Sequence, residues 1–370
     1  MAVKKSNNMD FTLLITVLVL LAIGVAMVFS ASSISSQLKF QDKYHFLKSQ
    51  GTYAILGIGV MLFMSRFNYK ILGKFAPALV VVSIILLILV FVPGIGFKAN
   101  GAWRWIQIGP IPMQPSEVAK FAMILFMAKS ISTKKDKIRT FFQGVVPYVM
   151  LLGIFCVLII LEPNKSTAMI FVLIAFTLLF AAGARIWHLL VWGLPLIPAA
   201  AYIFIKDKYS LLRITSYMDP WADPLKSGYQ AIQSLLALGS GGLFGLGLGN
   251  SRQKFFYIPE PQNDFIFSII GEELGFIGTV TIIVLFLLLI WRGIRIAVHA
   301  PDSFGCLLAT GIVCMIGIQV VLNIAVATVS IPTTGVSLPF ISSGGTSLVF
   351  VMANMGILLN ISKHIKTVGS

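Results

Sequence analysis

Four of the thirteen acidic residues of this chain lie in one stretch, residues 257–275. Glu260 and Asp264 precede a long apolar run, and Glu272 and Glu273 lie inside it. A carboxylate at the edge of an apolar segment is placed to act as a general base, whereas one inside the segment needs a partner. We therefore expect Asp264 to lie at a membrane surface and to have a functional role; the alternative is that it only caps the following helix.

The two inner glutamates lie about 12 Å below Asp264 if the run is a helix that rises about 1.5 Å per residue. Adjacent helical positions point about 100° apart, so Glu272 and Glu273 cannot share one narrow face and each requires partners or a wet cavity. A structural ion pair and a functional role are equally compatible with this spacing. Gly271 and Gly275 predict that a neighbouring helix approaches closely at this level.

The composition places these acids in a membrane protein, because 57% of the residues are hydrophobic and the mean hydropathy is +0.92. Apolar runs of helix length recur along the chain and are too uniform for the alternating strands of a barrel. The sequence thus predicts an all-α polytopic membrane protein with about ten transmembrane helices. The expected spans are residues 11–30, 50–64, 75–95, 116–131, 144–161, 167–183, 187–205, 264–291, 304–328 and 345–362.

Lysine and arginine gather in alternate loops between these spans, which predicts that both termini are cytoplasmic. Residues 206–263 then form one long extracytoplasmic loop between the seventh and eighth spans, within a single membrane domain of residues 1–370. A loop of this length is usually functional or disordered. Aromatic residues and a short helix expected at Gln230–Leu238 favour a folded loop that packs on the outer mouth of the bundle.

Several function classes lose their usual evidence. The net charge of +15 is dispersed between helices, which favours topology and contact with anionic lipid over a nucleic-acid partner. The three cysteines show no C-x-x-C spacing, and neither H-E-x-x-H nor a P-loop occurs. We expect no disulfide framework, metalloprotease, ATP-driven pump or organic cofactor.

A glycine-rich segment, G239-S-G-G-L-F-G-L-G-L-G249, follows the expected short helix and has six glycines in eleven residues. It does not fit G-x-G-x-x-G, and no strand precedes it. One hypothesis is a flexible or tightly turned surface loop. The other is a backbone cradle for phosphate, because small residues let main-chain N–H groups approach an anion.

Two further outer segments carry polar residues. In the first, Arg104 lies between two tryptophans, one of them Trp105, and Pro115 opens a helix with Glu117 in its first turn and Lys120 three residues later. In the second, residues 333–347, small polar residues and glycines lead into the last span. Irregular backbone at membrane depth is tolerated only where protein or water covers it.

Five motifs stand out along the chain: N100-G-A-W-R-W-I with Q114-P-S-E-V-A-K, D219-P-W-A-D-P with G228-Y-Q-A-I-Q-S, G239-S-G-G-L-F-G-L-G, I258-P-E-P-Q-N-D-F-I-F with G271-E-E-L-G, and L338-P-F-I-S-S-G-G-T-S. They resemble those of the SEDS family (shape, elongation, division and sporulation), which includes RodA, FtsW and SpoVE. The resemblance extends over nearly the whole chain. The last motif, with Ser343 and Gly344, and the first are more similar to FtsW or SpoVE than to RodA.

The resemblance implies a peptidoglycan glycosyltransferase that polymerises lipid II, an undecaprenyl-pyrophosphate-linked disaccharide peptide, at the outer face of the bacterial plasma membrane. It implies a class B penicillin-binding protein as partner, with other division or sporulation membrane proteins. By similarity Asp264 is the essential carboxylate, and Trp105 and Glu117, with Arg104 alongside, match positions that the family needs. Lys120, Ser343 and Gly344 are counted with them as substrate-binding candidates. The family's Q-P-D-L-G-T is here E162-P-N-K-S-T167, with Asn164 in place of the aspartate.

The expected mechanism has Asp264 as the base for the acceptor 4-hydroxyl, which attacks the donor's anomeric carbon with inversion. Asp264 with Glu260 could also hold a divalent cation such as Mg²⁺ or Mn²⁺. The departing pyrophosphate would be stabilised by cations drawn from Arg104, Lys165, Arg213, Arg252 and Lys254.

Three alternatives remain open from the sequence. A lipid II flippase predicts a cavity reachable from both sides and function at Glu272 or Glu273. A non-catalytic scaffold that recruits a wall synthase predicts that site mutants still support wall synthesis. An ion-coupled transporter is the weakest alternative, because its acids usually lie near the midplane rather than at one surface.

Overall fold

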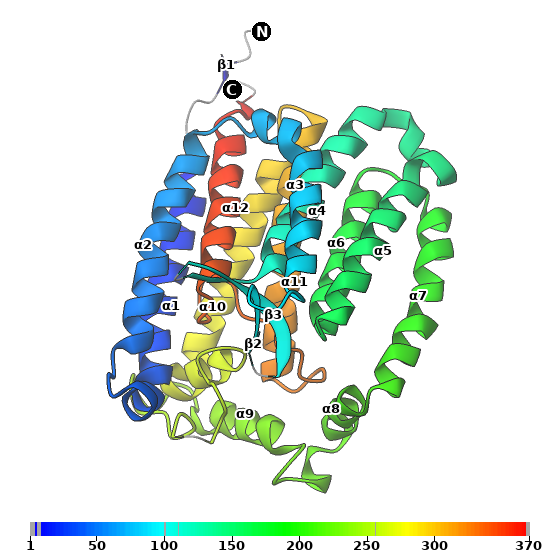
Figure 1. Ribbon diagram of the computed structural model, residues 1–370. Coiled ribbons are helices and arrows are strands. Elements are labelled where there is room, and N and C mark those ends of the chain that lie inside the picture. Colours follow the sequence, from blue (N-terminus) through cyan, green and yellow to red (C-terminus); the bar gives the residue numbers. More distant parts are fainter. Residues whose placement is uncertain (1–3, 6–8, 100, 110, 256, 368–370) are drawn as a thin grey trace.

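The computed structural model describes residues 4–5, 9–99, 101–109, 111–255 and 257–367, and within them the chain is a mostly helical bundle (Figure 1). Among the residues that the structure describes, six helices are long and apolar enough to cross a membrane, so this is a multi-pass membrane protein; they are α1, α2, α3, α5 with its preceding π-helical turn, α10 and α11. Every expected span overlaps a helix, although the span expected at 75–95 runs past the end of α3 at Leu89. The count of ten crossings stays a prediction. The helices are α1 (Phe11–Phe40), α2 (His45–Arg66), α3 (Tyr69–Leu89), α4 (Pro115–Lys134), α5 (Val146–Leu161, continuing the turn Phe141–Val145), α6 (Lys165–Ala181), α7 (Ile186–Lys206), α10 (Ile266–Val298), α11 (Ser303–Ala327) and α12 (Thr346–Ser362).

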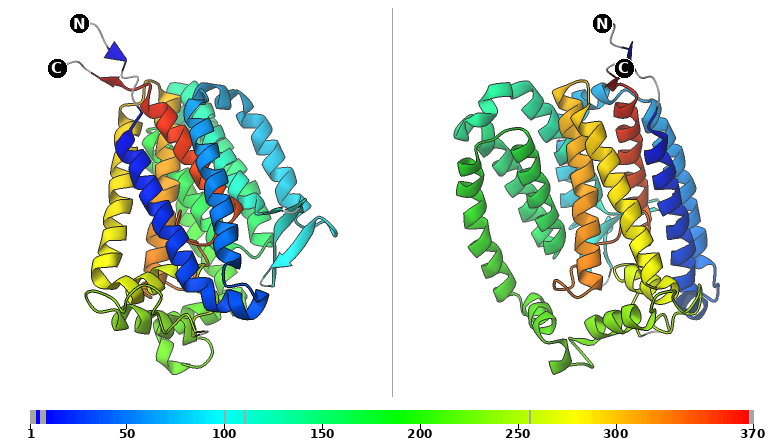
Figure 2. Two further views of the ribbon diagram at one scale, coloured as in Figure 1. Left: turned by 90° about the vertical axis from the view of Figure 1, so that its left-hand side faces the viewer. Right: turned by 180° about the vertical axis from the view of Figure 1, so that it is seen from behind.

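The two chain ends lie at the same end of the bundle, here called the terminal end (Figure 1). There β1 (Lys4–Lys5) pairs with β5 (Lys366–Thr367) in an antiparallel ladder. The opposite end, here called the loop end, carries α8 (Lys208–Met218) and α9 (Tyr229–Ser240). Helix α7 stands at the edge of the bundle in Figure 1 and in the right-hand view of Figure 2, and α8 and α9 lead the chain back from it to α10.

Two elements near the loop end were not expected. A three-stranded antiparallel sheet of β2 (Gly96–Ala99), β3 (Ala102–Ile108) and β4 (Ile111–Met113) precedes α4, so the all-α prediction is wrong in this detail. Ala99 pairs with Ala102, and Gly101, which directly precedes Ala102, has a φ of +80° that costs glycine little. Helix α8 also forms within residues 206–263, where we expected loop, whereas α9 confirms the expected short helix.

The terminal end is held by buried and partly buried polar contacts. Asp10 caps α1 by accepting from the Leu13 N–H (2.9 Å), and its carboxylate also accepts from Arg292 Nε of α10 (3.0 Å). The Asp10 N–H donates to Ser362 Oγ at the end of α12 (3.1 Å). One aspartate therefore ties together the ends of three helices.

Candidate active site

Asp264 lies at the loop end, in the segment that leads into α10. It is not the helix cap, because α10 begins after Phe265 and has no side-chain cap, so the capping alternative is wrong. Its side chain is partly exposed. On one side lies Gly335, where an added Cβ would come within 3.5 Å of Asp264 Oδ2. The carboxylate therefore faces the loop-end segment 333–347 of the protein.

Burial raises the pKa of the Asp264 carboxyl to about 6, and three charged side chains act on it. Arg213 and Arg104 lower this pKa, and Glu260 raises it. The structure thus brings together four of the residues that the sequence singled out. Among the residues that the structure describes, none donates a hydrogen bond to the Asp264 carboxylate, so its oxygens can accept a proton or a substrate hydroxyl.

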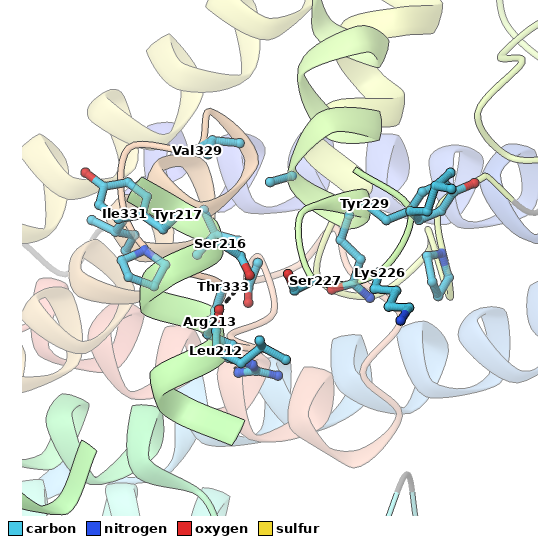
Figure 3. Close-up of a pocket in the computed structure, with 16 residues that line it drawn as sticks. Leu212, Arg213, Ser216, Tyr217, Lys226, Ser227, Tyr229, Val329, Ile331 and Thr333 are labelled. Carbon is cyan, nitrogen blue, oxygen red and sulfur yellow. Dashed lines mark hydrogen bonds between the residues drawn. The ribbon is translucent and has the colours of Figure 1, made fainter. Parts of the chain in front are cut away.

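A cavity of about 400 Å³ is lined by Arg213 and by residues 331–333, at the start of the loop-end segment (Figure 3). Arg213 and Thr333 lie on one wall, where Arg213 Nη1 donates to the Thr333 carbonyl oxygen (2.9 Å). Ser227, Lys226 and Tyr229 line the other wall. Small-molecule sites usually have volumes of about 300–1,000 Å³, so the cavity has the size and mixed lining of a ligand site.

Arg104 and Trp105 lie on β3. Arg104 donates from Nε to the carbonyl oxygen of Glu162 (3.1 Å) and from Nη2 to that of Pro163. The Glu162 side chain is fully buried, and burial raises its pKa to about 8 while Arg104 lowers it. Trp105 is half-buried and pairs with Phe97 in the sheet. Arg104 therefore ties the sheet to the α5–α6 turn as well as acting on Asp264.

Two other predicted cations lie in ion pairs. Lys120 and Glu117 form a buried i,i+3 pair (Nζ to Oε1, 2.9 Å) in the first turns of α4, which confirms the partner expected for Glu117. Lys165 Nζ lies 2.6 Å from Asp207 Oδ2 and 2.8 Å from Ser210 Oγ. Both lysines carry a carboxylate as neighbour, and their roles toward a substrate stay predictions.

Glu272 and Glu273 have no exposed surface, and their carboxylates are bound by the segment that follows the glycine-rich loop and by α1. Glu272 accepts from the Ser251 hydroxyl and from the Arg252 N–H (2.9 Å). Glu273 accepts from the Ser30 hydroxyl of α1 (2.6 Å) and pairs with Lys254 Nζ (3.2 Å). The expectation of partners in the bundle is confirmed, and the contacts favour the structural alternative for both glutamates.

Lys254 and Arg252 were predicted to face a pyrophosphate, and the structure separates them. Lys254 is buried and its ammonium pairs with Glu273 and the carbonyl oxygen of Gly249. This placement contradicts a substrate-facing role for Lys254, because its ammonium is buried and already has partners within the protein. The Arg252 side chain is exposed while its N–H holds Glu272.

The glycine-rich segment docks on a break in α10. Gly275 has φ +68° and ψ −165° inside this helix, and an added Cβ would lie 2.3 Å from Gly245 N. The N–H groups of Leu246 and Gly247 donate to the carbonyl oxygens of Glu272 (2.9 Å) and Glu273 (3.0 Å). These amides are not available to an anion, so the tight-turn hypothesis holds over the phosphate cradle.

The close approach predicted at Gly271 also occurs. An added Cβ there would lie 2.4 Å from Leu238 Cδ2 of α9, so the neighbour is this short helix. Ser343 and Gly344 lie beside the Asp264 segment, where the Ser343 N–H donates to the Gln262 carbonyl oxygen (2.9 Å). No group of three or more His, Cys, Asp or Glu side chains that could hold a metal occurs in the described ranges.

The FtsW/RodA/SpoVE family model of cell cycle proteins matches residues 11–367. The chain belongs to this family. It is 46% identical over 360 residues to Stage V sporulation protein E of Bacillus subtilis (strain 168), covering 97% of this chain and 98% of that protein. It is 43% identical over 363 residues to the probable peptidoglycan glycosyltransferase FtsW of Geobacter sp. (strain M18), covering 98% and 99%.

Solved structures of the FtsW/RodA/SpoVE family share the fold. One belongs to a study of how a peptidoglycan synthase complex coordinates polymerization and crosslinking; it has a TM-score of 0.79 and 29% identity, covering 96% of this chain and 97% of that one. The rod shape determining protein RodA of Thermus thermophilus has a TM-score of 0.70 and 28% identity, covering 96% of each chain. The predicted family is confirmed, and the higher identities are to SpoVE and FtsW members.

One residue that contacts the Asp264 backbone was not singled out from the sequence. Asn323, fully buried on α11, donates from Nδ2 to the carbonyl oxygens of Asp264 (2.9 Å) and Val336 (2.8 Å). A buried amide in an apolar helix is itself a signal, because polar side chains inside a membrane need partners. Nothing in the sequence spacing names Asp264 as that partner.

Proposed function

We propose that this chain is a peptidoglycan glycosyltransferase that polymerises lipid II, with Asp264 as its catalytic base. The relatives named FtsW carry that enzyme name, and the chain covers nearly their whole length. The observation that carries the residue assignment is the Asp264 carboxylate itself, which is partly buried, has a pKa raised to about 6 and lies among Arg213, Arg104 and Glu260.

In the proposed reaction Asp264 takes the proton of the acceptor sugar's 4-hydroxyl. The hydroxyl oxygen forms a bond to the donor's anomeric carbon as the bond from that carbon to the pyrophosphate oxygen breaks, which inverts the configuration. A base with a pKa near 6 is largely ionised at neutral pH and still takes up a proton.

Positive charge for the departing undecaprenyl pyrophosphate comes from Arg213 and Arg104, since both act on Asp264 electrostatically. Arg252 is exposed on the same loop and is the third candidate. Lys254 leaves this group because of its ion pair with Glu273. The cavity beside Arg213 is assigned to the head group of a substrate.

A divalent cation such as Mg²⁺ or Mn²⁺ fits the chemistry of Glu260 and Asp264. Glu260 raises the pKa of Asp264, so two negative charges lie close together. Mg²⁺ is commonly bound by one or two carboxylates together with substrate phosphates and water. When bound, the cation would neutralise charge on the pyrophosphate, and these two residues would hold it.

We assign the loop end to the outside of the bacterial plasma membrane and both termini to the cytoplasm, with ten crossings. The distribution of lysine and arginine supports this orientation. A class B penicillin-binding protein is the proposed partner, because a structural neighbour belongs to a complex that combines polymerization with crosslinking. Service in division or sporulation follows from the similarity to FtsW and SpoVE.

The flippase alternative placed function on Glu272 or Glu273. Both are fully buried and bonded to the loop, a position that suits an anchor better than a moving substrate pathway. The scaffold alternative differs from a glycosyltransferase only in activity. It is therefore separated by the experiment below.

The test is polymerisation of lipid II in vitro by the purified chain with its partner. Asp264→Asn should lose turnover by at least about 100-fold, the usual scale for a general base. Asp42→Asn is the matched control, since it removes another carboxylate in an exposed loop and should leave turnover unchanged. Glycan chains of wild-type length and rate from Asp264→Asn would reject the base assignment, and no polymerisation by wild type would favour the scaffold.

A further inference from the structure

Three successive backbone carbonyls lead into α10, and each is held by a different group. The Gln262 oxygen accepts from the Ser343 N–H (2.9 Å). The Asn263 oxygen accepts from the Ser342 hydroxyl (2.7 Å), and the Asp264 oxygen accepts from Asn323 Nδ2 (2.9 Å). The path of the chain beneath the Asp264 carboxylate is therefore fixed residue by residue.

Asn323 also fixes the other side of that carboxylate. Its second N–H donates to the Val336 carbonyl oxygen (2.8 Å), and Val336 follows Gly335, which lies against Asp264 Oδ2. Gly335 has φ +74°, a conformation that other residues adopt only with strain. A single amide thus sets the separation between the Asp264 backbone and the segment beside its side chain.

The amide is poorly suited to a purely stabilising role. Asn323 has no exposed surface, and across the described ranges its Oδ1 accepts no hydrogen bond. An apolar side chain at this position would avoid an unpaired buried oxygen. What the amide adds over an apolar residue is the pair of donors to Asp264 and Val336.

We propose that Asn323 is a positioning residue that sets the geometry of the Asp264 carboxylate. Ser342 supports it by holding the Asn263 carbonyl oxygen. The inference rests on the proposed function of Asp264 as base. Asn323 touches no reacting atom and acts through the backbone of Asp264 and through Gly335. Misplacement of a catalytic group by about 1 Å can cost on the order of 100-fold in rate.

The test compares Asn323→Leu with Asn360→Leu. Asn360 is a buried amide of α12 at the terminal end that also pairs two backbone groups, the Ser65 oxygen (3.0 Å) and the Tyr69 N–H (3.1 Å). Asn323→Leu should lower kcat about 10-fold to 100-fold with KM changed less than about twofold. Asn360→Leu should lower the thermal unfolding temperature and leave kcat per folded molecule unchanged.

A second measurement reports on position without turnover. Infrared difference spectra between wild type and Asp264→Asn isolate the protonation of this carboxyl, which Arg213, Arg104 and Glu260 face. Asn323→Leu should move the protonation midpoint toward lower pH, because a displaced segment admits water to the carboxylate. Ser342→Ala should move it in the same direction by less, and it serves if Asn323→Leu does not fold.

The outcomes are separable. An unchanged kcat and midpoint in Asn323→Leu would overturn the positioning role, as would an equal loss of kcat in Asn360→Leu. Full turnover by Asp264→Asn would instead reject the base assignment, while the infrared midpoint would still report whether Asn323 positions the carboxyl.

Discussion

Two groups of carboxylates lie within one short stretch of this chain and have opposite surroundings. Glu272 and Glu273 are fully buried inside α10 and accept from hydroxyls, amides and an ammonium. Asp264 lies before the helix, partly exposed, and its backbone rather than its carboxylate is held by hydrogen bonds. The oxygens of the two glutamates are occupied by donors of the protein, whereas the Asp264 carboxylate is available to a substrate group.

The difference shows that the donors around a carboxylate decide its role more than its type does. A carboxylate that accepts several hydrogen bonds from the protein has its oxygens occupied and is less available to a substrate hydroxyl. One that is buried without such donors has a raised pKa, as Asp264 has, and gains more from taking a proton. The buried pair anchors the loop, and Asp264 is left available for chemistry.

The substitution with the largest expected effect on stability removes the Lys254 ammonium that pairs with Glu273. Lys254→Met leaves Glu273 buried without its cation and should lower the free energy of unfolding by about 3–5 kcal/mol. Adding Glu273→Gln removes the other charge and should recover a large part of the loss. Unfolding by SDS titration in mixed micelles measures both. A loss below about 1 kcal/mol for Lys254→Met would mean that Glu273 is not held by this pair.

The next test removes one neutral donor. Ser251→Ala deletes the hydroxyl that donates to Glu272 and should cost about 1.5–3 kcal/mol, the range for hydrogen bonds to charged groups. Arg252→Ala is the neighbouring control, because it keeps the N–H that also binds Glu272. It should change the free energy of unfolding by less than about 0.5 kcal/mol. Equal effects of the two substitutions would mean that the Ser251 hydroxyl does not stabilise the protein through Glu272.

At Asp264 a substitution should stabilise the protein instead of destabilising it. The folded pKa of about 6 for Asp264 lies above the ordinary value of 3.8, so the ionised form is disfavoured in the folded state and costs stability above pH 6. Asp264→Asn should therefore stabilise the protein at pH 8 by about 1–2 kcal/mol, after an allowance for solvent screening. The gain should shrink as the pH falls through 6 toward 4. A destabilised Asp264→Asn at pH 8 would place this carboxylate with the anchoring pair instead.

The smallest effect concerns the pH dependence of activity. Because the base must be ionised, kcat/KM should fall tenfold per pH unit below a midpoint near 6 and level off above it. Glu260→Gln should move this midpoint down by less than about one unit, since the Glu260 charge raises the pKa of Asp264. A pH–rate profile for both proteins measures the shift. A midpoint that moves upward would contradict the electrostatic relation between the two acids.

The helices were predictable because long apolar runs leave few other structures in a membrane. The Glu117–Lys120 pair was predictable because its partners are three residues apart on one helix. The sheet of residues 96–113 was missed, since strand pairing is non-local and is a weak signal in a chain dominated by helical runs. The helix extension of α1 to Phe40 was missed because its last ten residues are largely polar.

At the site, chemistry was easier to predict than placement. Asp264 stood out by its type and position, but Lys254 was counted as a substrate cation because its partner Glu273 lies 19 residues away. Gly275 fitted a helix-packing motif, and its partner turned out to be a loop backbone. Asn323 is 59 residues from Asp264, and only folding brings the two together.

The node at Asp10 constrains how the molecule can move. Because the same aspartate fastens α1, α10 and α12 at the terminal end, these helices share one fixed point there. We therefore expect displacements that accompany substrate entry to be smallest at this point and to grow with distance from it. The largest amplitude is then expected at the opposite surface, where sugars would arrive and the new glycosidic bond would form in the proposed reaction.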